Sequence, residues 1–308
     1  MKLSQAIDLF LVSVRADGRK EKTIEYYRQC LTPCCAFLND TDLESITSNQ
    51  LREFLASLYA RNERWVSHPR VKPKQGGLSL FTIQGYLRAL KRFFNFCVAE
   101  EYIKPSQNPA ARLKRQRIPR TIPKEMSDDD LRAILQESRK SMFPQRDYAL
   151  ILFLAGTGCR VGGLVGLRVG DLDFERRRAV VTEKGDKSRI IPLSEKIVDA
   201  LREWLAVRRA SSDYVFVKRR SGEQMNGDSA ALVLTRLAHR ANVKGHHNPH
   251  SLRHRYAKKY LMNGGDLASL SRLMGHYDIS VTSNYYSIFS IEELQEKQEK
   301  FSPLRGLV

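Results

Sequence analysis

The sequence lacks an apolar run long enough to cross a membrane, since a spanning helix needs about 18 consecutive apolar residues. In the N-terminal segment "MKLSQAIDLFLVSV", Asp8 interrupts the apolar run and no small-residue cleavage site follows. The apolar residues Leu3, Ile7, Phe10, Leu11 and Val14 recur at the spacing of one helix face. We therefore predict an amphipathic helix here, not a signal peptide, and we expect no membrane partner.

Cysteine is scarce, and the motifs of nucleotide binding are absent. The five cysteines are an odd number and form no CxxC pair, which favours reduced thiols in a cytosolic protein over a disulfide framework. Glycines occur in "GTGCR" and "EKGDK", but neither GxxxxGK[ST] nor GxGxxG is present. The sequence therefore gives no reason to expect a nucleotide cofactor.

Acidic residues are too few to balance the basic ones. Lys and Arg number 52 against 34 Asp and Glu, which leaves a net charge of +18. Residues 1–115 hold 19 basic and 11 acidic side chains, and residues 116–308 hold 33 and 23. A solvated basic surface would explain a small excess, but an excess of this size in both parts favours a polyanion as partner.

Hydrophobic spacing predicts a mainly α-helical protein with a small β-sheet. Residues 1–104 show helical periodicity, with Thr23 and Ser48 as candidate N-caps. The apolar "RDYALILFLAGTGCRVGGLVGL" predicts the buried helix of a second domain, and "RAVVTEKGDKSRIIPL" predicts a hairpin or the edge of a three-stranded sheet. Everything after about residue 195 is predicted to be helical. We expect domains at 1–110 and 126–308, joined by a basic linker at 111–125.

Two basic segments interrupt the helical pattern. Residues 62–77, "NERWVSHPRVKPKQGG", predict an exposed loop, for which nucleic-acid contact and simple disorder are equally good interpretations. The segment "NPAARLKRQRIPRTIPK" holds three prolines and enough positive charge to lie along a phosphate backbone. The candidate DNA-contact residues of the two segments are Arg64, Arg70, Lys72, Lys74, Arg112, Lys114, Arg115 and Arg117.

Four short motifs in the predicted second domain carry side chains that can take part in catalysis. They are "TGCRVGGL" with Arg160, "TEKGDKSR" with Lys184 and Lys187, "HSLRH" with His250 and Arg253, and "LMGHYDISVTSNYYSIF" with His276, Tyr285 and Tyr286. Each motif alone has an ordinary explanation, such as a structural salt bridge for Arg160 or a solvated turn lysine for Lys184.

Three histidines at intervals of four, His246, His250 and His254, raise the question of a metal site. Pro249 breaks or begins the helix between the first two. The cluster contains no acid to complete a zinc ligand set, and Arg253 and Arg255 would repel a dication. We therefore expect no metal.

Taken together, the four motifs suit a phosphodiester under attack. Two arginines can donate in parallel to the oxygens of one phosphate. A lysine and a histidine can move protons near neutral pH. A tyrosine hydroxyl has an ordinary pKa of about 10, so it becomes a nucleophile only where cations and a base assist it.

In order and spacing the motifs resemble those of the tyrosine recombinase, or phage integrase, family, which includes the Xer-type recombinases. The pattern is "TGCR" at 157–160, "EKGDKSR" at 183–189, "HSLRH" at 250–254, "MGH" at 274–276 and Tyr285 nine residues after His276. The N-terminal helices followed by "NPA" resemble the family's core-binding domain. The resemblance implies a two-domain clamp on double-stranded DNA, with a helical core-binding domain and a mixed α/β catalytic domain.

The resemblance also implies a role for each motif residue. Arg160 and Arg253 match the phosphate clamp, Lys184 the acid that protonates the departing 5′ oxygen, and His250 the proton-transfer histidine. His276 matches a hydrogen-bond donor to the scissile phosphate, and Tyr285 matches the nucleophile that forms a 3′-phosphotyrosine. Neither metal nor nucleotide is implied. The resemblance also predicts a monomer that assembles into a homotetramer on paired DNA sites. It predicts a location in the cytoplasm, in association with the nucleoid.

The sequence departs from the family pattern at several positions. An acid usually stands three residues after the first arginine, where this chain has Gly163, so the expected carboxylate beside Arg160 is missing. Arg255 replaces a usual Thr or Ser, and we count it with Lys187 as a further candidate DNA contact. Two alternatives therefore remain beside a recombinase: a DNA-binding protein without efficient strand exchange, and a metal-dependent nuclease built on the histidines.

The C-terminal segment "SIEELQEKQEKF" predicts a capped helix, because Ser290 and Glu293 have the spacing of a capping box. Its apolar stripe can pack within the same chain. The resemblance favours docking on a neighbouring protomer instead.

Overall fold

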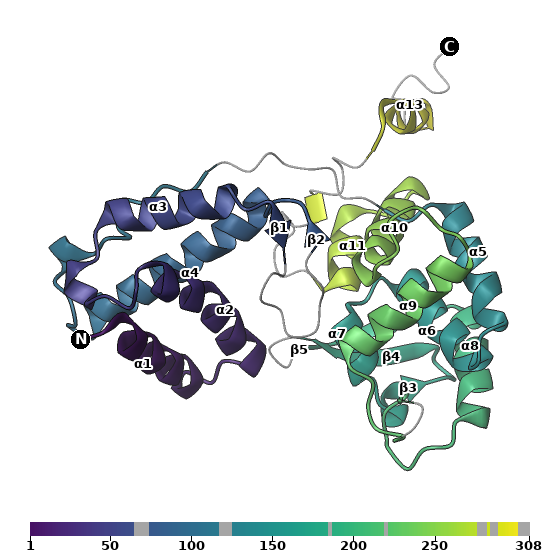
Figure 1. The fold of residues 1–308 in the computed structure, drawn as a ribbon. Coiled ribbons are helices and arrows are strands. Elements are labelled where there is room, and N and C mark those ends of the chain that lie inside the picture. The colour runs from purple at the N-terminus through teal and green to yellow at the C-terminus, as the bar shows by residue number, and fades with distance from the viewer. Residues whose placement is uncertain are drawn as a thin grey trace. The chain divides into compact units, whose positions relative to one another are not determined.

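The computed structural model describes residues 1–64, 74–116, 125–183, 187–218, 221–275, 282–283 and 289–300. The chain divides into two compact units, Met1–Arg120 and Thr121–Val308, whose helices are labelled in Figure 1. Within the ranges just given, no helix is both long enough and apolar enough to cross a membrane. The predicted fold class, mainly helical with a small sheet, is confirmed.

The first unit is built on helices that share one apolar core. The helices are α1 (Leu3–Ala16), α2 (Glu21–Phe37), α3 (Ser48–Tyr59) and α4 (Leu80–Ala99), with short 3₁₀ turns at Leu43–Ser45 and Pro105–Gln107. Strand β1 (Glu63–Arg64) pairs antiparallel with β2 (Lys74–Gln75). The whole predicted apolar face of α1 is buried, and Phe10 of that face packs edge-on against Phe93 of α4, with ring centroids 5.7 Å apart. Helical periodicity therefore located this core correctly.

Two predicted N-caps in this unit are wrong. Helix α2 begins at Glu21 after Lys20, so Thr23 lies within its first turn, where an acid such as Glu21 suits the positive end of the helix dipole. Helix α3 is capped by Thr47, whose hydroxyl accepts from the backbone N–H of Gln50 at 3.3 Å. Ser48 instead donates its hydroxyl to the carbonyl of Pro109 at 2.8 Å.

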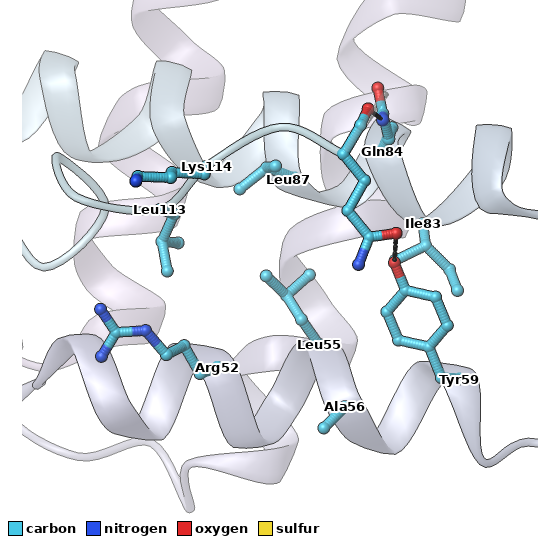
Figure 2. Close-up of a pocket in the computed structure, with 10 residues that line it drawn as sticks. Arg52, Leu55, Ala56, Tyr59, Ile83, Gln84, Leu87, Leu113 and Lys114 are labelled. Carbon is cyan, nitrogen blue, oxygen red and sulfur yellow. Dashed lines mark hydrogen bonds between the residues drawn. The ribbon is translucent and has the colours of Figure 1, made fainter. Parts of the chain in front are cut away.

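The chain that follows α4 stays attached to the first unit as far as residue 116. Ala110 and Leu113 are buried in its core, and Figure 2 shows Leu113 and Lys114 beside Leu87 of α4 and Arg52 of α3. Tyr59 donates its hydroxyl to the Gln116 Oε1 at 2.8 Å. The beginning of the segment predicted as a linker is thus held on the surface of α3 and α4.

The second unit places helices around a three-stranded sheet. Its helices are α5 (Asp128–Arg139), α6 (Pro144–Thr157), α7 (Val161–Gly166), α8 (Glu195–Val207), α9 (Gly227–Arg240), α10 (Pro249–Met262), α11 (Leu267–Met274) and α13 (Ile291–Lys300). A 3₁₀ turn spans Val169–Asp171. The strands are β3 (Leu172–Asp173), β4 (Arg178–Glu183) and β5 (Lys187–Pro192), antiparallel in the order β3-β4-β5.

Helix α6 is the buried helix that the sequence predicts. Ala149, Leu150, Ile151, Phe153 and Leu154 are all buried in the core of the unit. The sheet covers this core with alternate residues of β4, since Ala179 and Val181 are buried while Val180 is 38% exposed. This period of two is the expected pattern for a sheet with one solvated face.

The expectation that everything after residue 195 is helical is wrong for the chain between α8 and α9. Residues 208–218 and 221–226 contain no helix. They form isolated bridges, Arg168 with Tyr214 and Val217 with Gln224, and Trp204 of α8 donates its indole N–H to the carbonyl of Val215 at 2.8 Å. These non-local contacts bury Val215 and Phe216 and outweigh the local pattern.

Candidate active site

A tight turn at the end of α6 positions Arg160. Gly158 ends the helix in the left-handed conformation, with φ of 60°, and a Cβ built on it would lie 2.4 Å from the Cδ1 of Tyr256 on α10. Both conditions require glycine. The chain then turns so that Arg160 is the N-cap of α7, with its side chain 40% exposed. The guanidinium is therefore anchored at its base and accessible from solvent.

Arg253 is bound to the same turn from α10. Asn248 caps this helix by accepting from the backbone N–H of Ser251 at 2.9 Å, and Pro249 occupies its first position. Arg253 is only 4% exposed. It donates through Nη1 to the carbonyl of Gly158 at 2.5 Å and through Nη2 to the carbonyl of Met274 at 2.8 Å. The two predicted clamp arginines thus share one structural element, the turn at 157–160.

Position 163 carries no acid, but Glu183 at the end of β4 supplies a carboxylate beside Arg160. Its Oε1 accepts from the backbone N–H of Arg160 at 3.3 Å and pairs with Arg189 Nη1 at 2.8 Å. Its Oε2 pairs with Arg160 Nη1. Burial raises the pKa of Glu183, but the Arg189 hydrogen bond and the charges of Arg189 and Arg160 outweigh it, so the pKa lies below its ordinary 4.5.

Arg189 of β5 connects the hairpin to α11, because its Nε donates to the carbonyl of Leu273 at 3.1 Å. The sequence motifs predict no function for Glu183 or Arg189. A signal was available, because Ala179, Val181 and Glu183 have the same parity along β4 and the first two face the core. Strand alternation therefore directs Glu183 inward.

His250 lies in the first turn of α10 and is exposed. Burial, followed by the charges of His250 and Arg253, lowers the pKa of neighbouring His254 below 6.5, so His254 is neutral at physiological pH. Within the described ranges, no group of three His, Cys, Asp or Glu side chains is arranged to hold a metal ion. Burial also raises the pKa of Cys159, beside Arg160, to about 11, so this thiol is protonated.

The remaining predicted catalytic residues, Lys184, His276 and Tyr285, lie outside the described residues, as does Tyr286. Lys184 directly follows Glu183, and the pairing of Glu183 with Lys187 closes the described part of the hairpin. Helix α11 ends at Met274, followed by Gly275 in the left-handed conformation with φ of 65°. His276 is the next residue in the sequence.

The predicted DNA contacts fall into three groups. Arg112, Lys114 and Arg115 are exposed. The backbones of Arg64, Lys74 and Lys187 belong to strands, and Arg70, Lys72 and Arg117 lie outside the described residues. The Nη2 of Arg255 pairs at 2.8 Å with Asp128 and so connects α10 to α5. Contact between Arg255 and DNA stays a prediction.

The C-terminal helix α13 begins with the predicted capping box. Ser290 N–H donates to Glu293 Oε2 at 2.8 Å, and Glu293 N–H donates to Ser290 Oγ at 3.2 Å. Lys258 of α10 pairs with Glu293 at 2.7 Å. Ile291 and Leu294 are 68% and 44% exposed, so α13 retains an exposed apolar face.

Solved structures with a similar fold include two DNA-bound integrases. The chain matches the Tn1549 transposon integrase in complex with transposon right end DNA with a TM-score of 0.73 and 21% identity, over 98% of this chain and 100% of that one. A lambda integrase dimer bound to a COC′ core site gives a TM-score of 0.72 and 18% identity, over 91% and 97%. The described part of this chain therefore has the fold that these integrases share.

Sequence comparison then identifies the family. Residues 124–290 match the model of the phage integrase family. The tyrosine recombinase XerA of Pyrococcus furiosus is 28% identical over 99% of this chain and 96% of its own length. The tyrosine recombinase XerC of Thermodesulfovibrio yellowstonii is 32% identical over 74% of this chain and 78% of its own length. The chain belongs to the phage integrase family, as its motifs indicate, and is a Xer-like tyrosine recombinase.

Proposed function

We propose that this site-specific DNA recombinase cleaves and rejoins DNA through a 3′-phosphotyrosine on Tyr285. The observation that carries the proposal is the bond from Arg253 to the carbonyl of Gly158, two residues before Arg160. It joins two guanidinium groups to one turn, which suits them to bind one phosphate in parallel. Family membership supports the assignment of the remaining roles.

In the proposed reaction, the Tyr285 oxygen attacks the scissile phosphorus while the bond from phosphorus to the 5′ oxygen breaks. His250 accepts the tyrosine proton, and Lys184 donates a proton to the departing 5′ oxygen. Arg160 and Arg253 stabilise the charge that develops on the non-bridging oxygens, and His276 adds a hydrogen bond. Attack by the 5′ hydroxyl of another strand reverses the step, so neither a metal nor a nucleotide enters the reaction.

We assign residues 1–110 to a core-binding domain, residues 111–125 to a basic linker and residues 126–308 to the catalytic domain. The exposure of Arg112, Lys114 and Arg115 and the even spread of positive charge support contact with a phosphate backbone along both units. Double-stranded DNA as substrate supports a location in the cytoplasm, on the nucleoid.

Strand exchange involves two duplexes and four strands, so we propose that monomers assemble into a tetramer on paired sites. The exposed Ile291 and Leu294 of α13 are the surface that would dock on a neighbouring protomer. Such a contact is heterologous and closes into a ring only when the rotation is right. DNA supplies that geometry, and the free protein is therefore monomeric.

A covalent adduct is the test. A binding site is first selected from a random DNA pool, and a nicked suicide version is then incubated with the protein in EDTA. We expect a protein–DNA adduct that Tyr285→Phe abolishes and the adjacent control Tyr286→Phe retains, with DNA affinity unchanged in both. Loss of the adduct in the Tyr286 variant alone would reassign the nucleophile, and cleavage only with added metal would indicate a nuclease.

The alternative of a DNA-binding protein without strand exchange rested on Gly163. That reason is removed, because Glu183 places a carboxylate on Arg160. Binding without adduct formation in the same assay would restore this alternative.

A further inference from the structure

The space beside Gly163 on α7 is already filled by β4. Gly163 is buried one turn after Arg160. A Cβ built on it would lie 2.4 Å from Val181 Cγ1, 3.4 Å from Glu183 Cγ and 3.7 Å from Glu183 Oε1. A side chain projecting from α7 at this position and the observed Glu183 side chain therefore compete for one volume.

Glu183 holds Arg160 at two points. One carboxylate oxygen accepts from the backbone N–H of Arg160, and the other pairs with its guanidinium. The Glu183 side chain is only 7% exposed and also pairs with Arg189. A charge-assisted pair at low exposure fixes a side-chain orientation more firmly than a solvated one.

The carboxylate leaves the cluster able to bind an anion. Glu183 contributes one negative charge, whereas Arg160 and Arg189 contribute two positive charges. The Arg160 side chain remains 40% exposed although it is paired with Glu183. An ion pair can also block a site by competing with its ligand, and this opposite role predicts the opposite effect of mutation.

We propose, on the basis of the function proposed above, that Glu183 is the positioning residue for Arg160, a task that this chain performs from the hairpin instead of from α7. The carboxylate orients the guanidinium toward the scissile phosphate before DNA binds. Because Lys184 follows Glu183 directly in the chain, the same strand end carries the residue that orients the phosphate clamp and the proposed proton donor.

The test compares wild type with Glu183→Gln, which keeps the shape of the side chain and removes its charge. The adduct-forming rate is measured on a suicide site with an ordinary scissile phosphodiester and on one with a methylphosphonate there. The methylphosphonate lacks one charged non-bridging oxygen, so it depends less on a well-placed Arg160. We expect a loss of about 10- to 100-fold on the phosphodiester, as for outer-shell partners of metal ligands, and a much smaller loss on the methylphosphonate.

Controls separate positioning from folding and from the proposed function. Glu223→Gln removes an acid that pairs with Lys218 at 3.2 Å in the same domain and is expected to behave as wild type. Glu183→Asp keeps the charge and is expected to recover part of the rate, with thermal unfolding and half-site binding measured for each variant.

Equal losses on the two substrates would reduce Glu183 to a structural residue and overturn the inference. Faster cleavage by Glu183→Gln would show a blocking pair and overturn it as well, as would an unchanged rate. A wild-type chain that forms no adduct on the phosphodiester would refute the proposed function, and the inference with it. Activity in wild type alongside an unaffected Glu183→Gln would refute the inference only.

Discussion

Arg253→Lys keeps the positive charge of the clamp but removes its geometry. In the wild-type chain the buried guanidinium reaches the carbonyls of Gly158 and Met274 at once. A guanidinium carries five N–H donors in a rigid plane, whereas an ammonium is a point charge on a flexible stem. Lysine therefore cannot reproduce both backbone contacts and also donate in parallel to a phosphate.

The size of the effect follows from these contacts. Leaving one buried carbonyl without a partner costs about 1–3 kcal/mol of folding stability. Losing one set of donors to the transition state costs about 3–4 kcal/mol, or roughly 10²–10³ in rate, by analogy with an oxyanion donor. We therefore expect the cleavage defect to exceed the stability defect.

The two effects are measured separately. Adduct formation is timed at saturating protein on the suicide site, below the temperature at which either protein melts. Stability is measured separately by thermal unfolding. Arg132→Lys is the control, since Arg132 pairs with Asp129 on the exposed face of α5. A cleavage rate for Arg253→Lys within about threefold of wild type, less than about 0.7 kcal/mol, would mean that Arg253 only packs.

Four further outcomes are expected. If both units bind DNA through roughly ten phosphate contacts, the logarithm of the association constant falls with the logarithm of salt concentration at a slope near −9. A slope shallower than about −3 refutes binding by both units. Deleting residues 290–308 preserves half-site binding in gel shifts but removes cooperative binding and strand exchange; normal recombination refutes docking in trans. Gly163→Ala lowers the free energy of unfolding by about 1–3 kcal/mol, because the new Cβ overlaps Val181. Adding Val181→Ala restores part of the lost stability, and a Gly163→Ala variant as stable as wild type contradicts the packing. The pKa of Glu183 is depressed in the folded chain, so its stabilisation is complete above the unfolded value near 4.5 and is lost as the pH falls through the lower folded value. The stability gap between wild type and Glu183→Gln therefore shrinks as acid is added, and a gap independent of pH contradicts this.

Local pattern was enough to predict the amphipathic helix α1, the buried helix α6 and the hairpin of β4 and β5. The buried face of α1 follows from spacing alone, and Gly158 stands where a left-handed turn requires glycine. These features depend on residues close together in the chain. They are therefore visible without knowledge of the tertiary contacts.

Glu183 was missed because a charged residue at a strand end is normally solvated. Its burial is favourable only when Arg160, 23 residues earlier, and Arg189, six residues later, both reach it. The irregular chain around Val215 was missed for the same reason, because its partners lie on other elements. The wrong caps have a different origin. Thr47 and Ser48 are both capping residues, and the extended backbone at Thr47 selects the first. Helix α2 begins after Lys20 without a side-chain cap.

The backbone contacts of Arg253 also set the order in which the site can assemble. Its two carbonyl partners lie 95 residues before it and 21 residues after it in the chain, so they meet only when α6, α10 and α11 have packed. The first unit, in contrast, buries its own core from residues within 1–120. Domains emerging from the ribosome fold from the N-terminus onward. A growing chain can therefore bury the core of its first unit well before Arg253 can reach both of its carbonyl partners.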